Sequence, residues 1–435
     1  MSPSRIAIVG ANFAGLSAAQ RLGSKYDVTV IDRSPWFEWR PGIHELVSGM
    51  KRPADLRLSR SRLVAQAGHQ FLRAEVAGID ARAGRLTTSD DRQVEFDACI
   101  VAVGGVSHSF GVAGAARYAL PLKTVDDGVA IGRRLATLAR RKGRKSVVIV
   151  GAGLEGIEVL GEILRRYRDR ESLDVTVVEA GLRLMPGSPS ALDATVRRHC
   201  AGLNVQFLTG TAVQSVTRSR VHLGSGKSIR SDLTLWTVGA TAPALIRDSR
   251  LADKPDHWAP VTRALRSRRF DNVFVAGDAA ALPRPLARQA YYAMQTGQCA
   301  AENAMRALAG RRLREFIPVA KPMLVAFGNL DTFLVSGRSV IASPTLAAAK
   351  ELVFQVTMAQ IDPPLGIRPL RALTGRLASA AVSLPPPRRK GRGLSPQGTV
   401  PDQPRSAGQR ANVRPAAPTP TSAVRIRRWT RSGGC

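Results

Sequence analysis

One pattern occurs twice in this chain of 435 residues, and it restricts the possible folds more than any other feature. Each copy contains a short apolar strand, a glycine-rich turn, a helix of small residues, a second apolar strand and a terminal acid. The first copy runs from Ile6 to Asp32, and the second runs from Val147 to Glu179. Two parallel strands joined by a helix form the unit of a doubly wound sheet. The repeat therefore predicts an α/β fold with two Rossmann-like domains.

The two glycine turns have the residues that a dinucleotide site requires. Their sequences are Gly10-Ala11-Asn12-Phe13-Ala14-Gly15 and Gly151-Ala152-Gly153-Leu154-Glu155-Gly156. The first glycine permits the sharp bend, the second lets the backbone approach a pyrophosphate, and the third lets the helix pack on the strand. The phosphates then lie at the helix N-terminus, where free N–H groups favour negative charge. Asn12 departs from this pattern because it places a side chain where the second glycine is expected.

The acid that ends each copy is expected to bind the hydroxyls of a ribose. These acids are Asp32 and Glu179. A carboxylate accepts hydrogen bonds from a free 2′-hydroxyl and repels a 2′-phosphate, so Glu179 favours NADH over NADPH. Arg183 lies nearby in the sequence and could instead bind a phosphate, which leaves NADPH as the alternative.

Later segments are expected to extend both sheets and then to form helices. Strands that end in glycine turns are predicted at residues 99–105, 233–240 and 272–280, and a helix is predicted from Ala290 to Leu308. Another helix with a broad apolar face is predicted from Leu346 to Ile361, and one more from about Leu370 with a basic side. Basic amphipathic helices suit an anionic membrane surface, and packing on the body of the protein is the alternative.

Charge and cysteine content limit the classes of protein. Lysine and arginine total 64 against 33 acids. Residues 385–435 hold eleven of the basic residues and a single acid, and their composition predicts disorder. The surplus in the body favours a polyanion or an anionic membrane face, unless it only keeps the surface soluble. Cys99, Cys200, Cys299 and Cys435 form no metal-binding or CxxC motif, so we expect no metal.

The N-terminus and the hydropathy bear on location. Residues 6–10 are typical of a buried strand and not of a secretory signal. No uninterrupted apolar stretch is long enough to span a membrane. We therefore expect a cytoplasmic protein that can associate with the inner face of the cell membrane.

The order of an FAD-type turn, an NAD-type turn and a late strand with Gly277 and Asp278 resembles the two-dinucleotide-binding-domain flavoproteins of the pyridine nucleotide-disulfide oxidoreductase superfamily. The resemblance implies an FAD domain at residues 1–118 and 245–330, with an NAD(P)H domain inserted at 119–244. A C-terminal α-helical region at 331–384 and a basic tail at 385–435 would follow. Residues 36–50 lack the cysteine pair of the disulfide reductases, which argues against a dithiol relay.

Within that superfamily the chain is most similar to the type II NADH dehydrogenases, which are peripheral membrane enzymes that reduce quinone. Residues 37–49, 151–162 and 316–328 carry the similarity. It implies catalytic roles for Glu158, near nicotinamide and flavin, and for Lys321, which would stabilise charge on the reduced flavin. The implied cofactor-binding residues are Gly10, Asn12, Phe13, Ala14, Gly15, Asp32, Arg33, Arg40, Pro41, Ala102, Gly104, Gly151, Gly153, Leu154, Glu155, Gly156, Glu179, Gly239, Gly277, Asp278 and Gln295.

The expected acceptor site departs from the pattern of those enzymes. Tyr291, Tyr292 and Gln295 would line it, but Tyr291 stands where a glutamine is usual. Pro322 replaces a glycine, and Glu155 replaces a threonine. The acceptor is therefore the least constrained part of the interpretation.

The implied activity is transfer of a hydride from NADH to FAD and of two electrons to a quinone. A ferredoxin reductase or small-molecule reductase is the alternative enzyme. An NADH-sensing flavoprotein similar to the apoptosis-inducing-factor group, with slow turnover, is the alternative from a non-enzyme class. Nucleic acid is not an expected partner, and a homodimer stays open.

Overall fold

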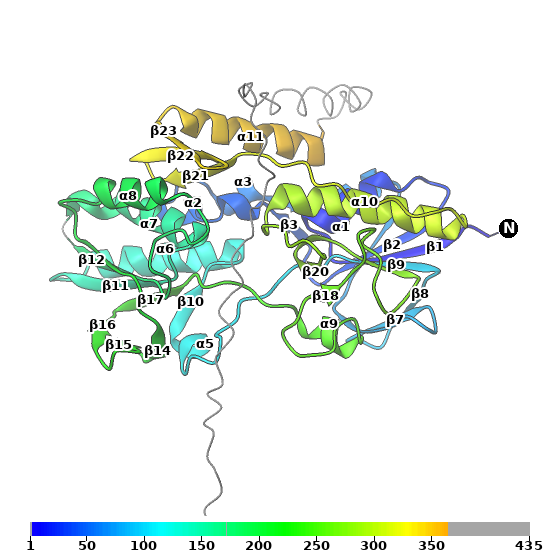
Figure 1. Ribbon diagram of the computed structural model, residues 1–435, viewed down its shortest axis with the longest axis horizontal. Coiled ribbons are helices and arrows are strands. Elements are labelled where there is room, and N and C mark those ends of the chain that lie inside the picture. The colour runs from blue at the N-terminus through cyan, green and yellow to red at the C-terminus, as the bar shows by residue number, and fades with distance from the viewer. Residues whose placement is uncertain (1, 171, 364–435) are drawn as a thin grey trace, which may run out of the picture. The chain divides into compact units, whose positions relative to one another are not determined.

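Two parallel β-sheets carry the two copies of the repeated pattern (Figure 1). The computed structural model describes residues 2–170 and 172–363. The strands of the first sheet are, in spatial order, β19 (Val273–Val275), β9 (Ala98–Val101), β1 (Arg5–Val9), β2 (Asp27–Asp32) and β5 (Gln70–Arg73). Those of the second sheet are β10 (Ala119–Pro121), β17 (Leu233–Trp236), β11 (Lys145–Val150), β12 (Leu173–Val178) and β13 (Val205–Leu208). The predicted α/β fold with two Rossmann-like domains is confirmed.

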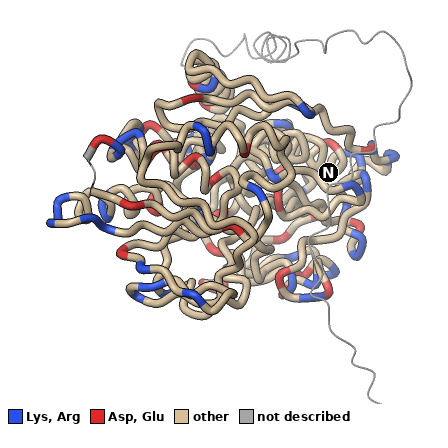
Figure 2. The backbone as a smooth tube through the Cα atoms, turned by 60° about the vertical axis from the view of Figure 1, so that its left-hand side comes forward, with Lys and Arg blue, Asp and Glu red and all other residues tan. Residues whose placement is uncertain are grey.

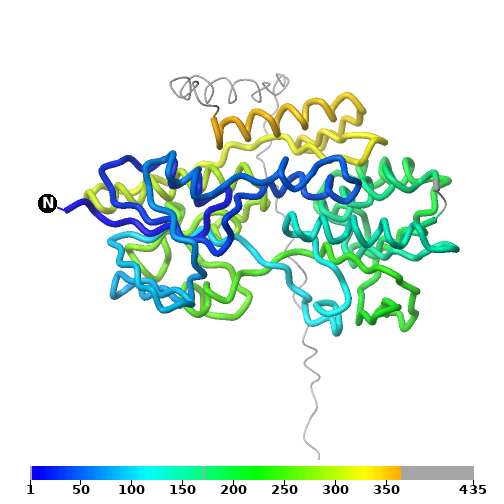
Figure 3. The backbone as a smooth tube through the Cα atoms, turned by 180° about the vertical axis from the view of Figure 1, so that it is seen from behind, coloured from blue at the N-terminus to red at the C-terminus, as the bar shows by residue number. Residues whose placement is uncertain are grey.

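The second sheet is inserted into the first. The chain leaves the first sheet after β9 and returns to it at β19, which pairs with β9 in parallel through Val273 and Cys99. The outgoing and returning segments lie side by side between the sheets, and an isolated bridge joins Val106 to Thr241 (Figure 3). We keep domain boundaries near residues 118 and 244 as a proposal, because β10 begins at Ala119 and belongs to the second sheet.

Helices and smaller sheets surround the two parallel sheets. The helices are α1 (Phe13–Arg21), α2 (Glu45–Ser48), α3 (Pro53–Leu56), α4 (Arg60–Gln66), α5 (Ala115–Tyr118), α6 (Val125–Ala139), α7 (Leu154–Tyr167), α8 (Ser190–His199), α9 (Ala244–Asp248) and α10 (Ala290–Leu308). Short 3-10 helices are η1 (Arg40–Gly42), η2 (Arg168–Arg170) and η3 (Gly277–Ala279). The smaller sheets contain β3 (Trp36–Glu38) with β4 (Arg57–Ser59), then β6 (Val76–Asp80), β7 (Arg85–Thr88) and β8 (Gln93–Glu95), then β14 (Val213–Val216), β15 (Arg220–Leu223) and β16 (Ser228–Arg230), and finally β18 (Ala259–Pro260) with β20 (Ala280–Ala281).

Small residues let α1 and α10 pack closely against each other. A Cβ atom added to Gly297 of α10 would lie 2.1 Å from the carbonyl oxygen of Ala14 in α1. Only glycine permits this approach, since real Cβ atoms do not come so near a backbone oxygen. The contact brings Gly277 and η3 against the start of α1, where a Cβ on Gly277 would lie 3.0 Å from the Ala14 Cβ. The late strand is thereby held beside the first glycine turn.

The C-terminal part of the described chain combines strands with a helix. β21 (Met323–Phe327), β22 (Asp331–Ser336) and β23 (Ser339–Ala342) form an antiparallel sheet on which α11 (Leu346–Ile361) packs (Figure 1). The predicted helix at 346–361 is confirmed, whereas the three strands were not predicted. The helix expected from Leu370 and the tail at 385–435 lie outside the described residues. Among the described helices, none combines the length and apolarity that a membrane span requires.

Candidate functional site

The two glycine turns stand at the carboxyl edges of the two sheets in equivalent geometry. Gly10 and Gly151 have φ angles of +95° and +101°, in the left-handed region that favours glycine. Their N–H groups donate to the carbonyl oxygens of Ile31 and Val178, in each case at 2.8 Å. Ile31 and Val178 directly precede the acids that end the second strands. Each acid is therefore fixed beside its own turn.

Glu179 illustrates how that acid is held. Its Oε2 accepts a hydrogen bond from the Ala152 N–H at 2.7 Å, and its Oε1 accepts one from the Gly181 N–H at 2.7 Å. Each carboxylate oxygen keeps a further lone pair for a ligand hydroxyl. Both hydrogen bonds that the described residues make to the Glu179 carboxylate come from backbone N–H groups, and Arg183 is exposed. The site thus presents a carboxylate whose charge is not neutralised by a neighbouring side chain.

Asp32 has the same backbone contacts but differs in its charge environment. Its Oδ2 accepts from the Ala11 N–H at 2.8 Å, and its Oδ1 accepts from the Ser34 N–H at 2.9 Å. Arg60 forms a buried ion pair with Asp32 and donates from Nε to the Ala11 carbonyl at 2.9 Å. Burial lowers the pKa of Arg60, and the Asp32 carboxylate opposes that change. The acid of the first copy is therefore paired with an internal cation.

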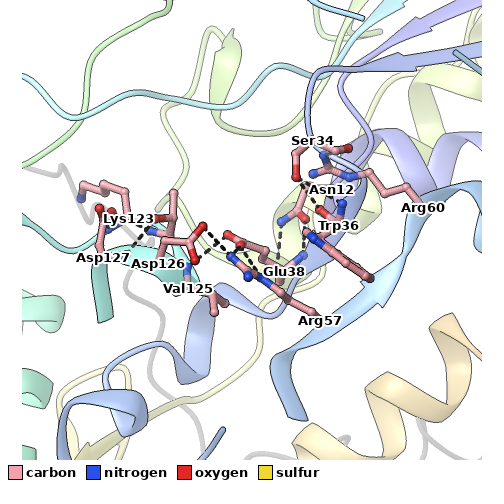
Figure 4. A network of polar contacts seen from close by, with 11 residues as sticks. Asn12, Ser34, Trp36, Glu38, Arg57, Arg60, Lys123, Val125, Asp126 and Asp127 are labelled. Atoms are coloured by element: carbon pink, nitrogen blue, oxygen red, sulfur yellow. Dashed lines mark hydrogen bonds and ion pairs between the residues drawn. The ribbon is translucent and has the colours of Figure 1, made fainter. Parts of the chain in front are cut away.

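The structure explains the asparagine in the first turn. Asn12 Nδ2 donates to the carbonyl of Glu38 at 3.2 Å, and the Glu38 N–H donates to Asn12 Oδ1 at 3.0 Å (Figure 4). The amide is used by the chain itself, which binds β3 to the turn. At the equivalent position of the second turn, a Cβ on Gly153 would meet no atom within 4 Å, so backbone is open to a ligand there.

Both helix N-termini are suited to a pyrophosphate. Asn12, the N-cap residue of α1, makes no side-chain capping hydrogen bond, and Gly153, the N-cap residue of α7, has no side chain. The first N–H groups of an α-helix have no partner within the helix and favour an anion. A Cβ on Gly156 would lie 2.0 Å from the Gly151 carbonyl oxygen, which shows how tightly α7 starts against its strand. The two helix N-termini therefore fit the pyrophosphates of two dinucleotides.

Charged side chains gather between the two turns. Lys123 Nζ contacts both carboxylate oxygens of Glu155, at 2.8 and 2.6 Å. Burial raises the pKa of Asp278, and the nearby positive charges of Arg288, Arg40 and Lys123 oppose the rise. Arg40 also lies near Gly104, whose added Cβ would be 4.0 Å from its guanidinium. Lys123 and Arg40 thus stand close to Asp278 and Glu155 at once.

Glu158 is buried in a cluster that joins α2, α7 and α11. We define this Glu158 cluster as His44, Glu45, Glu158, Glu162 and Lys350. Lys350 Nζ lies 2.6 Å from Glu158 Oε1, which also accepts from the Ala326 N–H at 3.1 Å, and His44 Nδ1 lies 3.4 Å from Oε2.

Burial shifts the protonation equilibria of this cluster. Burial raises the pKa of Glu158, which is only 6% exposed, and the Lys350 ammonium opposes the rise. Burial raises the pKa of Glu45 to about 7, and it lowers the pKa of His44 well below its usual value. Burial also raises the pKa of Glu162, which Ser48 and Arg165 oppose by hydrogen bonding. The carboxyl groups of Glu45, Glu158 and Glu162 thus lie close to the ammonium group of Lys350.

The expected acceptor residues lie at the start of α10. The rings of Tyr291 and Tyr292 have centroids 4.2 Å apart, and Tyr291 Oη donates to the Lys321 carbonyl at 3.4 Å. Gln295 exchanges two hydrogen bonds with the backbone of Val319, at 3.1 and 2.9 Å. The side chain of Lys321 is exposed. The structure therefore brings Tyr291, Gln295 and the backbone of segment 319–321 together.

Other predicted cofactor residues fall into two groups. Phe13 and Ala102 are buried, Gly104, Gly239 and Gly277 have positive φ angles, and Pro41 lies in η1, next to the turn region. Arg33, in contrast, points to a surface partner, since its guanidinium donates to Glu75 Oε1 at 3.1 Å. The structure therefore does not gather Arg33 with the other predicted residues.

The described cysteines and acids offer little to thiol or metal chemistry. Burial raises the pKa of Cys99 and of Cys200 to about 12, and that of Cys299 to about 11. A thiol with so high a pKa is a poor nucleophile at neutral pH. Within residues 2–170 and 172–363, no group of His, Cys, Asp or Glu side chains is arranged to hold a metal ion.

Comparison with known proteins agrees with this geometry. Residues 4–297 match the family model of the pyridine nucleotide-disulphide oxidoreductases. The chain belongs to that family. It is therefore an oxidoreductase, and the matched residues include both glycine turns.

Three known proteins are similar to this chain. The type II NADH:quinone oxidoreductase of Staphylococcus epidermidis is 26% identical over 386 residues, which cover 80% of this chain and 94% of that protein. The NDH2 structure from Plasmodium falciparum in complex with NADH has a TM-score of 0.72 at 16% identity, covering 82% and 94% of the two chains. The sulfide:quinone oxidoreductase of Aquifex aeolicus has a TM-score of 0.73 at 16% identity, covering 85% and 95%.

Several residues at this site of the oxidoreductase were not found from the sequence. Arg60, Lys123 and Lys350 each pair with a predicted residue that lies 28, 32 or 192 positions away. Only Lys123 has a local signal, because Thr124 and Asp127 form a capping box that predicts the start of α6. That signal places the helix but does not identify the partner of the lysine.

Proposed function

We propose that the chain is an FAD-dependent NADH dehydrogenase that passes two electrons to a quinone. The observation that carries the proposal is the duplicated site, in which Asp32 and Glu179 are held in the same way beside Gly10 and Gly151. One molecule of each cofactor would occupy one turn. The named function of the staphylococcal relative supports this assignment.

The residues of the first site fit FAD. The N-terminus of α1 would hold the pyrophosphate, Asp32 the ribose of the adenosine, and Asp278 the ribityl end. When bound, FAD would accept a hydride from NADH and deliver two electrons to the acceptor. The contribution of the protein is to hold the two cofactors in contact and to exclude competing reactions. Arg40 would add positive charge at the pyrophosphate.

The second site fits NADH better than NADPH. The Glu179 carboxylate is directed by two backbone N–H groups and has no described cationic partner. A 2′-phosphate placed there would meet an uncompensated negative charge. Glu158, with Lys350 and the Ala326 N–H on its Oε1, would orient the nicotinamide from α7.

The acceptor end of the proposal has a second candidate. Tyr291 occupies the position where similar enzymes have a glutamine, and its hydroxyl lies near the Lys321 carbonyl. A reductase of another small acceptor would have the same nucleotide sites and a different acceptor pocket. Lysine and arginine occur in loops of both domains (Figure 2), so the basic surplus does not by itself select a ferredoxin.

Association with a membrane surface is supported by the outer face of α11. Leu352, Val353 and Val356 are 63%, 41% and 38% exposed, while Phe354 of the same helix packs on Trp39. Ile317 and Val319, near the acceptor residues, are also exposed. Exposed apolar residues rimmed by polar ones are typical of membrane contact sites. We propose attachment to the inner face of the cell membrane.

The test uses the purified full-length protein. We expect a flavin absorption spectrum, rapid bleaching by NADH without oxygen, slower bleaching by NADPH, and recovery of the spectrum on addition of a short-chain quinone. Absence of bound flavin would refute the nucleotide assignment. Recovery with oxidised ferredoxin or another small acceptor, but not with quinones, would favour the second candidate.

A further inference from the structure

Two residues that depart from the usual turn patterns lie at opposite ends of one network of polar contacts. They are Asn12 in the first turn and Glu155 in the second. We define the inter-turn network as Asn12, Glu38, Arg57, Asp126, Lys123 and Glu155, with the start of α6 between them. Figure 4 shows its part from Asn12 to Lys123.

The first half of the network ties the first turn to α6. Asn12 holds the backbone of Glu38 by two hydrogen bonds. The Glu38 carboxylate accepts from Arg57 at 2.8 and 3.0 Å through Oε1, and from the Val125 N–H at 3.2 Å through Oε2. Arg57 reaches on to Asp126, at 2.8 Å. Glu38 thus satisfies one of the free N–H groups at the start of α6.

The second half ties α6 to the second turn. The Lys123 and Thr124 N–H groups both donate to Asp127 Oδ2 at 2.9 Å, which fixes the backbone at Lys123. From that position the ammonium contacts both oxygens of Glu155, in the first turn of α7. The side chains of Lys123 and Glu155 are 18% and 38% exposed, so this ion pair is partly sheltered from water.

We propose that the inter-turn network holds the second nucleotide site in register with the first, and that Glu155 is its positioning residue. The proposal rests on the proposed function, since register between the sites matters only if both are occupied. Reaction between two bound molecules requires their reacting atoms at near-contact distance, and small misplacements reduce rates by large factors. A covalent linker alone would not fix that distance.

The charges of Lys123 and Glu155 predict an effect on NADH binding that a purely structural role would not produce. The N-terminus of α7 is where pyrophosphate is expected, and a bare carboxylate on Glu155 would repel it. Lys123 neutralises that carboxylate. Lys123→Met should therefore weaken NADH binding, whereas Glu155→Gln should leave it unchanged or tighter. Both changes should slow the reduction of flavin by NADH.

The experiment combines calorimetric titration of the flavin-loaded protein with NAD⁺ and stopped-flow reduction by NADH. For Glu155→Gln we expect reduction slowed about tenfold with a dissociation constant no larger than that of the wild type. For Lys123→Met we expect binding weakened about tenfold, with the double variant restored toward wild-type affinity but still slow. Lys123→Arg should retain most of the rate, because arginine also pairs with a carboxylate.

Controls separate this proposal from the proposed function. Glu95→Gln makes the same chemical change in an exposed pair with Arg5 and should alter neither quantity. If wild-type protein is not reduced by NADH, the proposed function fails. If it is reduced and Glu155→Gln stays within twofold of its rate, the inter-turn network is overturned.

A second readout needs no cofactor. Asn12→Ala and Glu155→Gln are combined, and the thermal unfolding of the cofactor-free protein is compared with that of each single variant. Members of one network couple, so the double variant should lose less than the two single losses together. Strictly additive losses would show that the two ends are independent and would overturn the proposal.

Discussion

Glu45 provides a direct test of the buried electrostatics around Glu158. It lies at the start of α2, and burial raises the pKa of its carboxyl from 4.5 to about 7, with the negative charges of Glu162 and Glu158 adding to the rise. Native protein therefore retains a proton on Glu45 in a pH range where the unfolded chain has lost it. Stability falls as pH rises wherever the native state binds more protons than the unfolded state. The contribution of Glu45 is thus fully present below pH 4.5 and is lost between pH 4.5 and about 7.

The size of the effect follows from the same values. A rise from 4.5 to about 7 corresponds to about 3 kcal/mol. Since Glu45 is only partly buried, screening by solvent reduces this to roughly 1–2 kcal/mol. The Glu45→Gln variant has no charge to desolvate, so it should be more stable than wild type by that amount at pH 8 and nearly equal to it at pH 5.

The assay is denaturant unfolding of both proteins at several pH values between 5 and 8. Glu315→Gln serves as the matched control, because Glu315 is 64% exposed and its pair with Arg263 spans 3.6 Å. The control should follow the wild-type curve at every pH. A Glu45→Gln variant that is equally or less stable than wild type at pH 8 would refute the reasoning.

Three further predictions address other parts of the molecule. Lys350→Met removes the cation that pairs with the buried Glu158 carboxylate and should lower the unfolding free energy by about 3 kcal/mol in urea titrations. Adding Glu158→Gln should recover much of that loss. A double variant no more stable than Lys350→Met would contradict the pairing. Glu179→Ala should lower the ratio of kcat/KM for NADH to that for NADPH at least about tenfold, and an unchanged ratio would remove Glu179 from selectivity. Gly297→Ala should lower the free energy of unfolding by about 1–3 kcal/mol in thermal unfolding, because its Cβ would meet backbone atoms. Gly23→Ala adds a Cβ in open space and should leave the stability unchanged. Equal losses for the two variants would argue against the close helix contact.

The periodic features of the sequence predicted the elements that surround the two glycine turns. The strand, turn and helix assignments at 6–22, 147–164 and 290–308 agree with β1, α1, β11, α7 and α10. They succeed because buried parallel strands are nearly continuous apolar runs and because glycine turns interrupt them at fixed positions. The predicted helix at 346–361 also agrees with α11, residue for residue.

The elements and contacts that were missed depend on distant partners. β21, β22 and β23 are short strands whose apolar residues do not alternate clearly, and they become recognisable only when they pair with one another. The partner of Glu158 is a lysine in the last described helix, and no local pattern connects the two. Asn12 likewise departs from the glycine pattern of its turn, and the partner of its amide, Glu38, is 26 residues away. Chain topology, and not spacing, creates these contacts.

The two proposed nucleotide sites share their backbone geometry, and their difference lies in charge. Asp32 is paired with the buried Arg60, so the proposed first site would not use repulsion to select its ligand. Glu179 has only backbone N–H donors among its described contacts, so its charge remains available to exclude a phosphate. A preorganised, neutral site increases the affinity for a cofactor that stays bound. A substrate that enters and leaves must instead be distinguished from similar molecules at each turnover. The distribution of charge over one repeated motif therefore fits a resident nucleotide at the first turn and an exchanging one at the second.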